Sequence, residues 1–166
     1  MTKPPKFYWD TCAWLGFLNG DADKKRELQI VYGNARNGQC QLWTSTLSLV
    51  ETRRLAEEKD LPRPLSEENS KKIEAIFKQP FVYTIPLAVD IADRARGIIR
   101  TVSTIKKWQD AVHLASALRW NADVMHTYDH DDLLRLNLIY ECRNGQKLPI
   151  VYPDESTDGP LFSHTK

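Results

Sequence analysis

The sequence predicts an α/β fold in which helices cover both faces of a mostly parallel sheet. Strand-like and helix-like segments alternate along the chain, and the helical segments carry their apolar residues on one side. Of the 166 residues, 42% are hydrophobic and 27% charged, so the chain can bury a sizeable core without disulfides. We expect one domain over 1–152, followed by a flexible tail over 153–166 that is rich in Asp, Ser, Thr, Gly and Pro.

In the first half of the chain, strand signals alternate with helix signals. Clusters of aromatic and β-branched residues predict strands over 7–9, 41–44 and 81–85. Apolar residues at helical spacing predict helices over 24–35, 47–55 and 66–77. Ser66 is the expected N-cap of the third helix, and two prolines within 60–64 separate this helix from the one before it.

The second half of the chain continues the alternation. Two amphipathic stripes predict helices over 88–99 and 108–118. A short, partly apolar segment follows at 122–127, then a helical turn or two at 131–136 and a last strand at 148–152. This order of elements is typical of sheets that are built from strand–helix–strand units, in which the strands run parallel.

Net charge, cysteine content and hydropathy limit the possible classes of protein. A formal net charge of +1 gives no global basic field, so any contact with nucleic acid has to be local. The three cysteines are an odd number at wide spacing, which suits neither a disulfide framework nor a paired zinc site, and we expect reduced thiols. No run of about 18 apolar residues occurs, so we expect a cytoplasmic protein without a membrane segment.

Four acidic residues stand where a parallel sheet gathers ligands. Asp10 directly follows the first predicted strand, and Asp129 closely follows the segment 122–127. Glu51 and Asp110 lie on predicted helices among apolar neighbours. Side chains that leave the carboxyl ends of parallel strands converge over one crevice. Because an ionised carboxylate near an apolar face is costly unless a cation compensates it, these acids indicate a metal site.

The type of ligand indicates the chemistry. Carboxylate oxygens without a cluster of His or Cys favour the hard cations Mg²⁺, Mn²⁺ or Ca²⁺. Such cations bind phosphate oxygens and lower the pKa of a bound water, which predicts hydrolysis of a phosphodiester. For each acid taken alone, the alternative is a helix N-cap or a solvated loop residue.

The segments that carry these acids resemble the motifs of the PIN domain family, especially its VapC-type toxin ribonucleases. The first motif is Asp10 followed by Thr and an apolar helix start, and the second is the helix that bears Glu51. The third, 108–118, contains Asp-Ala followed by His-Leu-Ala, and the fourth, 122–131, contains Thr, any residue, Asp. In order and spacing, the resemblance covers residues 6–152.

The resemblance implies a three-layer PIN-like fold with a parallel five-stranded sheet flanked by helices. It implies endoribonuclease activity on RNA, with a Mg²⁺ or Mn²⁺ site formed by Asp10, Glu51, Asp110 and Asp129. The toxin branch further implies the toxin of a type II toxin–antitoxin pair, a homodimer and inhibition by a cognate antitoxin. Two alternatives stay open: a PIN-type nuclease that acts in RNA maturation or on DNA, and a catalytically silent module that binds RNA or protein.

Polar residues beside the four acids have competing interpretations. The Thr11 hydroxyl either orients a metal-bound water or caps the helix that starts at Ala13, and capping is the more common use of Thr at this position. Asp131 extends the acidic run after Asp129 as a fifth metal ligand. The alternative for Asp131, and the favoured one for Asp132, is a place in the first turn of a helix, where the helix dipole favours an acid.

Basic and aromatic residues near the motifs complete the predictions. We expect four of them to bind RNA phosphates, with a solvated surface as the alternative: Arg53, Arg54, Lys106 and Lys107. His113 lies three residues after Asp110 on the same side of the helix and is expected to be a packed or hydrogen-bonded structural residue. Core packing is expected, with base stacking as the alternative, of Trp14, Trp43 and Trp108.

Overall fold

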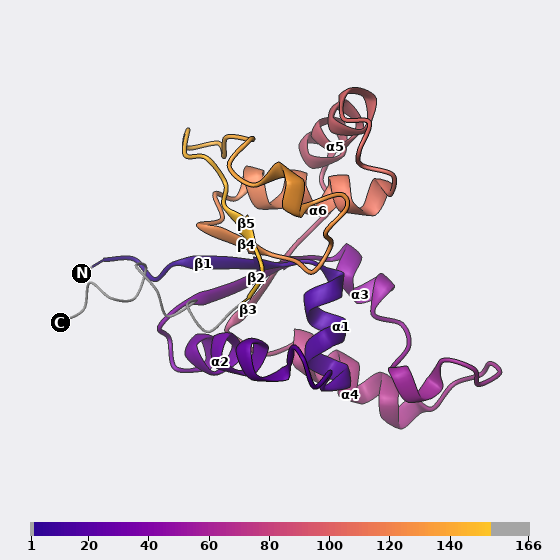
Figure 1. The fold of residues 1–166 in the computed structure, drawn as a ribbon. Helices are drawn as coiled ribbons and strands as arrows, with labels where there is room; N and C mark the ends of the chain where they lie inside the picture. Colours follow the sequence, from indigo (N-terminus) through magenta and orange to yellow (C-terminus); the bar gives the residue numbers. More distant parts are fainter. Residues whose placement is uncertain (1, 154–166) are drawn as a thin grey trace.

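Five parallel strands form the centre of the protein in a computed structural model that describes residues 2–153. The strands are β1 (Lys6–Trp9), β2 (Gln41–Ser45), β3 (Val82–Ile85), β4 (Val124–His126) and β5 (Ile150–Val151). Their order in the sheet is β3-β2-β1-β4-β5, and every neighbouring pair is parallel (Figure 1). The predicted parallel five-stranded sheet is therefore confirmed.

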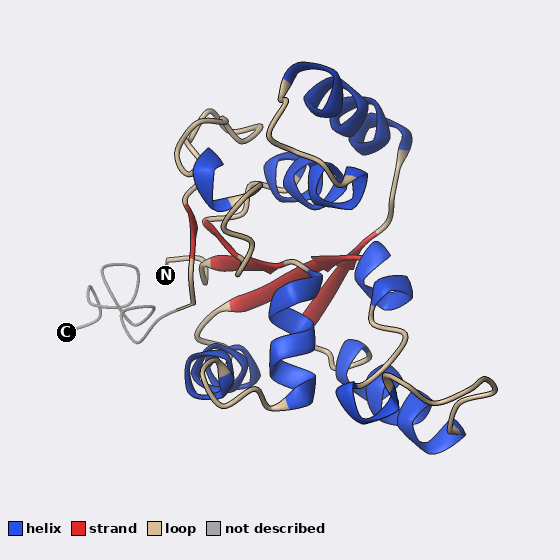
Figure 2. Ribbon diagram, turned by 45° about the vertical axis from the view of Figure 1, so that its right-hand side comes forward, coloured by secondary structure: helices blue, strands red, loops and turns tan. Residues whose placement is uncertain are grey.

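Helices cover both faces of this sheet, as predicted. They are α1 (Thr11–Asn19), α2 (Lys25–Arg36), α3 (Leu47–Glu51), α4 (Glu67–Phe77), α5 (Val89–Thr101) and α6 (Trp108–Arg119). Figure 2 shows α5 and α6 on one side of the strands and α1, α2 and α4 on the other. Two buried hydrophobic clusters fill the spaces between these layers, one on each face of the sheet.

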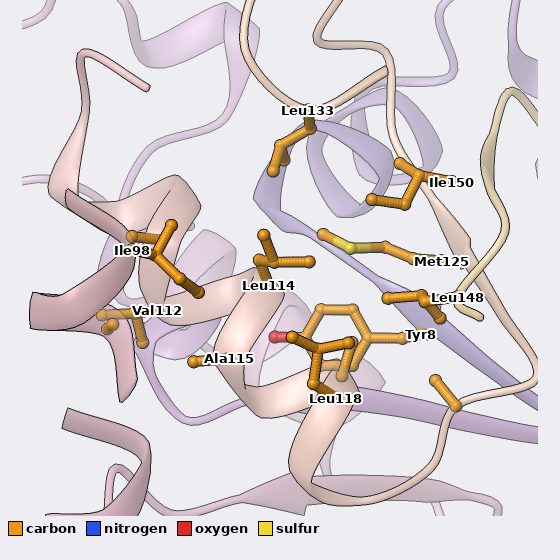
Figure 3. Packing of buried hydrophobic residues seen from close by; sticks show 14 of the residues in the cluster. Tyr8, Ile98, Val112, Leu114, Ala115, Leu118, Met125, Leu133, Leu148 and Ile150 are labelled. Atoms are coloured by element: carbon orange, nitrogen blue, oxygen red, sulfur yellow. The ribbon is translucent and has the colours of Figure 1, made fainter. Parts of the chain in front are cut away.

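The alternation of side chains along β1 explains why both faces are buried. Phe7 and Trp9 point into the cluster under α1, α2 and α4, whereas Tyr8 points into the cluster under α6. Figure 3 shows Tyr8 among apolar residues of α6 and of the strands beside it, including Leu114 and Met125. Because β1 lies at the centre of the sheet, the residue that follows it, Asp10, emerges at the middle of the edge where the strands end.

After β2, three elements differ clearly from the prediction. The helix expected over 47–55 ends at Glu51, because Thr52 leaves helical geometry while its hydroxyl donates a hydrogen bond to the Ser48 carbonyl. The helical turn expected over 131–136 is a short 3₁₀ helix, Leu134–Leu136. The last strand contains only two residues and pairs with β4 at the edge of the sheet.

Other expectations concern the cysteines, the membrane and the C-terminal tail. All three cysteines are free, as expected. In the part of the chain that the structure describes, no helix has the length and apolar character needed to cross a membrane. The predicted tail lies outside the described residues, apart from Pro153, which is buried.

Candidate active site

Asp10 is the most tightly held acid of the site. It follows β1 and caps α1, where its Oδ1 accepts a hydrogen bond from the Ala13 backbone N–H at 3.0 Å. Its Oδ2 accepts a 2.5 Å hydrogen bond from the Thr127 hydroxyl, and the residue is 1% exposed. Burial raises the pKa of the Asp10 carboxyl, although nearby His113 and the two hydrogen bonds oppose this shift.

Asp10, and not Thr11, is therefore the N-cap of the first helix, and the predicted cap role of Thr11 is wrong. The helix begins at Thr11, two residues earlier than expected, so Asp10 occupies the capping position. The Thr11 hydroxyl instead donates a 2.7 Å hydrogen bond to Oε1 of Glu51, across the start of the cavity described below.

Thr127 joins the ends of the neighbouring strands β1 and β4. It directly follows β4, and its hydroxyl donates to Asp10 while accepting a hydrogen bond from the Asp129 backbone N–H at 3.0 Å. The Asp129 side chain stabilises the turn that follows it. Its Oδ1 accepts hydrogen bonds from the backbone N–H groups of Asp131 at 3.1 Å and Asp132 at 3.0 Å. Thr127 had no predicted role, although the Thr-x-Asp pattern contains it.

Three carboxylates converge beside this turn. Oxygens of Asp110, Asp129 and Asp132 lie within 4.8 Å of one another. Asp110 stands in the first turn of α6 and is 8% exposed, and its Oδ2 is buried without a hydrogen-bond partner among the described residues. The pKa of Asp110 is raised to about 8, first by burial, then by its side-chain contact with Asp129 and by the negative charges of Asp129, Asp10 and Asp132.

These observations fit a divalent cation. A buried carboxylate oxygen without a partner is costly in the folded protein, and a bound cation removes that cost. The converging donors are carboxylate oxygens, without Cys or His among them, which is the donor set of Mg²⁺ or Mn²⁺.

The structure brings Asp132, not Asp131, into this group. Asp132 is 4% exposed, and its Oδ2 also accepts a 3.1 Å hydrogen bond from the Lys106 backbone N–H. Asp131 is exposed and does not belong to the group of converging oxygens. The backbone N–H groups of both residues bind Asp129 in one turn, in which Asp131 faces solvent and Asp132 is buried.

Glu51 reaches the same cavity from α3. Its Oε1 accepts hydrogen bonds from the Thr11 hydroxyl and from Nε2 of His113, the latter at 2.9 Å. Burial by itself raises the pKa of Glu51, but the hydrogen bonds from His113 and Thr11 outweigh it and hold the pKa below its ordinary value. His113 is buried and hydrogen-bonded, as predicted for this residue.

An open cavity of about 920 Å³ connects the acids with basic residues. Its lining includes all four predicted acids, Asp10, Glu51, Asp110 and Asp129. It also includes Arg53, Arg54, Arg63 and Lys107. Arg63, on the loop before α4, had no predicted role, because nothing in the local pattern of that loop distinguishes it from other exposed arginines.

Two of the predicted phosphate-binding residues are placed less favourably. Lys106 does not line the cavity, and its backbone instead holds Asp132. Arg54 lines the cavity, but its Nη1 donates to three backbone carbonyls, those of Glu58, Lys59 and Leu61. Arg54 therefore stabilises the loop after α3 with the same group that would bind phosphate.

The tryptophans were expected in the core. Trp14 is fully buried, and Trp43 is partly buried against the core, as predicted. For Trp108 the prediction is wrong, because this residue is 52% exposed. It is the first residue of α6, directly after Lys107 and two residues before Asp110, so it lies at the end of the helix that borders the open cavity.

Comparison with known proteins gives the family. The PIN domain model matches residues 7–137. No curated protein matches the sequence. The fold is similar to that of VapC20 from Mycobacterium tuberculosis, described as a sarcin–ricin loop cleaving toxin, at a TM-score of 0.54 and 17% identity over 75% of this chain and 91% of that one.

Two toxin–antitoxin structures have the same fold. A complex from Klebsiella pneumoniae matches with a TM-score of 0.57 and 17% identity over 89% of this chain and 98% of that chain. VapBC2 from Rickettsia felis, bound to a promoter DNA fragment, matches with a TM-score of 0.56 and 14% identity over 87% and 96%. At these identities the structures establish the fold, whereas the family model covers most of the sequence. The chain belongs to the PIN domain family.

Proposed function

We propose that this protein is a divalent-metal-dependent endoribonuclease that hydrolyses RNA phosphodiester bonds. The observation that carries the proposal is the buried Oδ2 of Asp110, which has no hydrogen-bond partner among the described residues and lies beside Asp129 and Asp132. A Mg²⁺ or Mn²⁺ ion is the ligand that best completes such a group. The cavity around it is open and bordered by basic residues, as a nucleic-acid backbone requires.

Each part of the cavity has a separate task in this proposal. Asp110, Asp129 and Asp132 would hold the ion, with Glu51 at the cavity wall as a further ligand. When bound, the ion neutralises phosphate charge and activates a water for attack on phosphorus. Asp10 joins the start of α1 to Thr127, because it accepts one hydrogen bond from the Ala13 backbone N–H and one from the Thr127 hydroxyl. Arg53, Arg63 and Lys107 bind phosphates on either side of the bond that is cut, which fixes the register of the RNA but reads no sequence.

We further propose that the protein is a toxin controlled by a cognate antitoxin in the cytoplasm, and that it forms a homodimer. The similar structures from Klebsiella pneumoniae and Rickettsia felis are toxin–antitoxin assemblies, and VapC20 is described as cleaving an RNA loop. These descriptions support RNA as the substrate class and an antitoxin as the partner. Coexpression with the product of a neighbouring short reading frame should suppress the growth inhibition that the protein causes when expressed alone.

Metal-dependent cleavage of RNA tests the proposed activity. Purified protein should cut single-stranded RNA in Mg²⁺ or Mn²⁺, lose the activity in excess EDTA and regain it when Mn²⁺ is restored. A DNA strand of the same sequence serves as the control and should be cut far more slowly. Cleavage that persists in EDTA would contradict the metal site, and equal cleavage of DNA would contradict the assignment to RNA.

Two adjacent lysines provide a matched test of the phosphate contacts. Lys107 lines the cavity, whereas Lys106 is exposed outside it. Lys107→Gln should therefore weaken RNA binding and reduce the slope of log K against log salt by about 0.7, as expected for one lost contact to a single strand. Lys106→Gln makes the same change in charge and should leave the slope almost unchanged. Equal effects of the two variants would show that only the general charge of the surface matters.

A further inference from the structure

Glu51 depends on residues outside its own helix for its orientation. It is the last residue of α3, which has only five residues, so this helix fixes the side chain weakly. The side chain is 24% exposed at the cavity wall. A Glu side chain that is free to change rotamer loses conformational entropy when a ligand orders it. A carboxylate that is already oriented avoids this cost.

A chain of hydrogen bonds from the core holds this carboxylate. The Tyr8 hydroxyl, on β1, lies 2.8 Å from Nδ1 of His113, on α6. Nε2 of His113 lies 2.9 Å from Oε1 of Glu51, and the Thr11 hydroxyl donates to the same oxygen at 2.7 Å. Tyr8 is 0% and His113 1% exposed, so water does not compete for these contacts.

The carboxylate of Glu51 sets the direction of the chain. An ionised carboxylate has no proton to donate, so Nε2 of His113 carries the ring hydrogen and donates it to Oε1 of Glu51. With the hydrogen on Nε2, Nδ1 of His113 accepts a hydrogen bond from the Tyr8 hydroxyl. Oε1 thus receives two hydrogen bonds, whereas among the described residues no hydrogen bond engages Oε2. The free oxygen is the one available to a ligand in the cavity.

We propose that Tyr8 and His113 are positioning residues, which turn Oε1 of Glu51 toward the protein and leave Oε2 facing the cavity, where it would bind a divalent cation. The proposal rests on the function proposed above. Partners that orient metal-binding side chains in this way typically contribute 10–100-fold to metal affinity or activity. A purely structural Tyr–His pair would contribute to stability instead, and this difference can be measured.

The variant Tyr8→Phe removes one hydroxyl and keeps the aromatic ring in the core. We expect Mn²⁺, titrated into the whole protein without RNA, to bind about tenfold more weakly. The kcat for RNA should fall by a similar factor, and KM should stay within about twofold, since no phosphate contact changes. Tyr32→Phe is the matched control, because it removes another buried hydroxyl from the opposite face of the sheet and should change neither value.

Two substitutions of His113 separate positioning from packing. His113→Gln keeps an N–H donor close to the position of Nε2, whereas His113→Leu has a similar size and no donor. His113→Leu should weaken Mn²⁺ binding about 10–100-fold, and His113→Gln should retain most of the affinity. Near-equal losses in both variants would indicate that His113 acts by packing and would overturn the proposal.

The remaining outcomes are also decisive. If Tyr8→Phe binds Mn²⁺ within twofold of the wild type, the proposal is wrong, whether or not His113→Leu folds. Because Mn²⁺ affinity is measured without RNA, it tests the positioning role even if the wild type cuts no RNA. A wild type that binds Mn²⁺ but cuts no RNA would contradict the proposed function and leave the positioning role intact.

Discussion

Asp110→Asn is expected to reduce RNA cleavage by about 10³-fold or more while the protein remains folded. Asn has the same shape as Asp but lacks the charge, and the buried Oδ2 of Asp110 is the oxygen that the proposed cation would bind. A metal ion lowers the activation free energy of phosphodiester hydrolysis by several kcal/mol, and each 1.36 kcal/mol changes the rate by a factor of ten. Single-turnover cleavage at saturating Mn²⁺ measures the loss, with circular dichroism as the check on folding.

The two neighbouring acids after Asp129 sharpen this test. Asp132 belongs to the converging group and Asp131 does not, so Asp132→Asn should reduce cleavage much more than Asp131→Asn. The amide oxygen of Asn at position 132 can still accept the hydrogen bond from the Lys106 backbone. If the order of the two effects is reversed, the turn is arranged differently from the one described here.

The same Asp110→Asn variant should make the metal-free protein more stable, and the gain should grow with pH. The pKa of Asp110 is raised to about 8 in the folded protein, whereas an unfolded Asp titrates near 4. Between these values the folded state holds a proton that the unfolded state has lost. The free energy of unfolding therefore falls as pH rises from about 4 to about 8, and the cost is complete above pH 8.

Urea denaturation in EDTA measures this difference. From about pH 5 to pH 8, the free energy of unfolding of the wild type should fall by about 2 kcal/mol relative to that of Asp110→Asn, because Asn does not titrate. Mn²⁺ at a hundredfold excess over its dissociation constant should stabilise wild type by about 2.7 kcal/mol and the variant much less. If Asp110→Asn is less stable than the wild type at every pH, and Mn²⁺ does not stabilise the wild type, then Asp110 is an ordinary structural acid.

The sequence pattern was sufficient for the sheet and for the convergence of the acids. The apolar triplet of β1 alternates between two cores, which is what a central parallel strand requires, and Asp10 follows it directly. Asp10, Glu51, Asp110 and Asp129 line one cavity because the elements that carry them end or begin at the same edge of the sheet.

Contacts between distant residues decided the details that the sequence did not predict. Local rules favour Thr11 as a cap, but its hydroxyl binds Glu51, which is 40 residues away. The choice between Asp131 and Asp132 depends on a turn around Asp129 and on the Lys106 backbone. Spacing along one helix or loop contains no information about such partners.

The position of the metal itself tests the central claim most directly. Crystals of the protein soaked in Mn²⁺ should give an anomalous peak within about 2.1 Å of carboxylate oxygens of Asp110 and Asp129. The peak should be absent from Asp110→Asn under the same conditions. A peak at another place, or none in wild type at saturating Mn²⁺, would contradict the carboxylate site on which the proposed function depends.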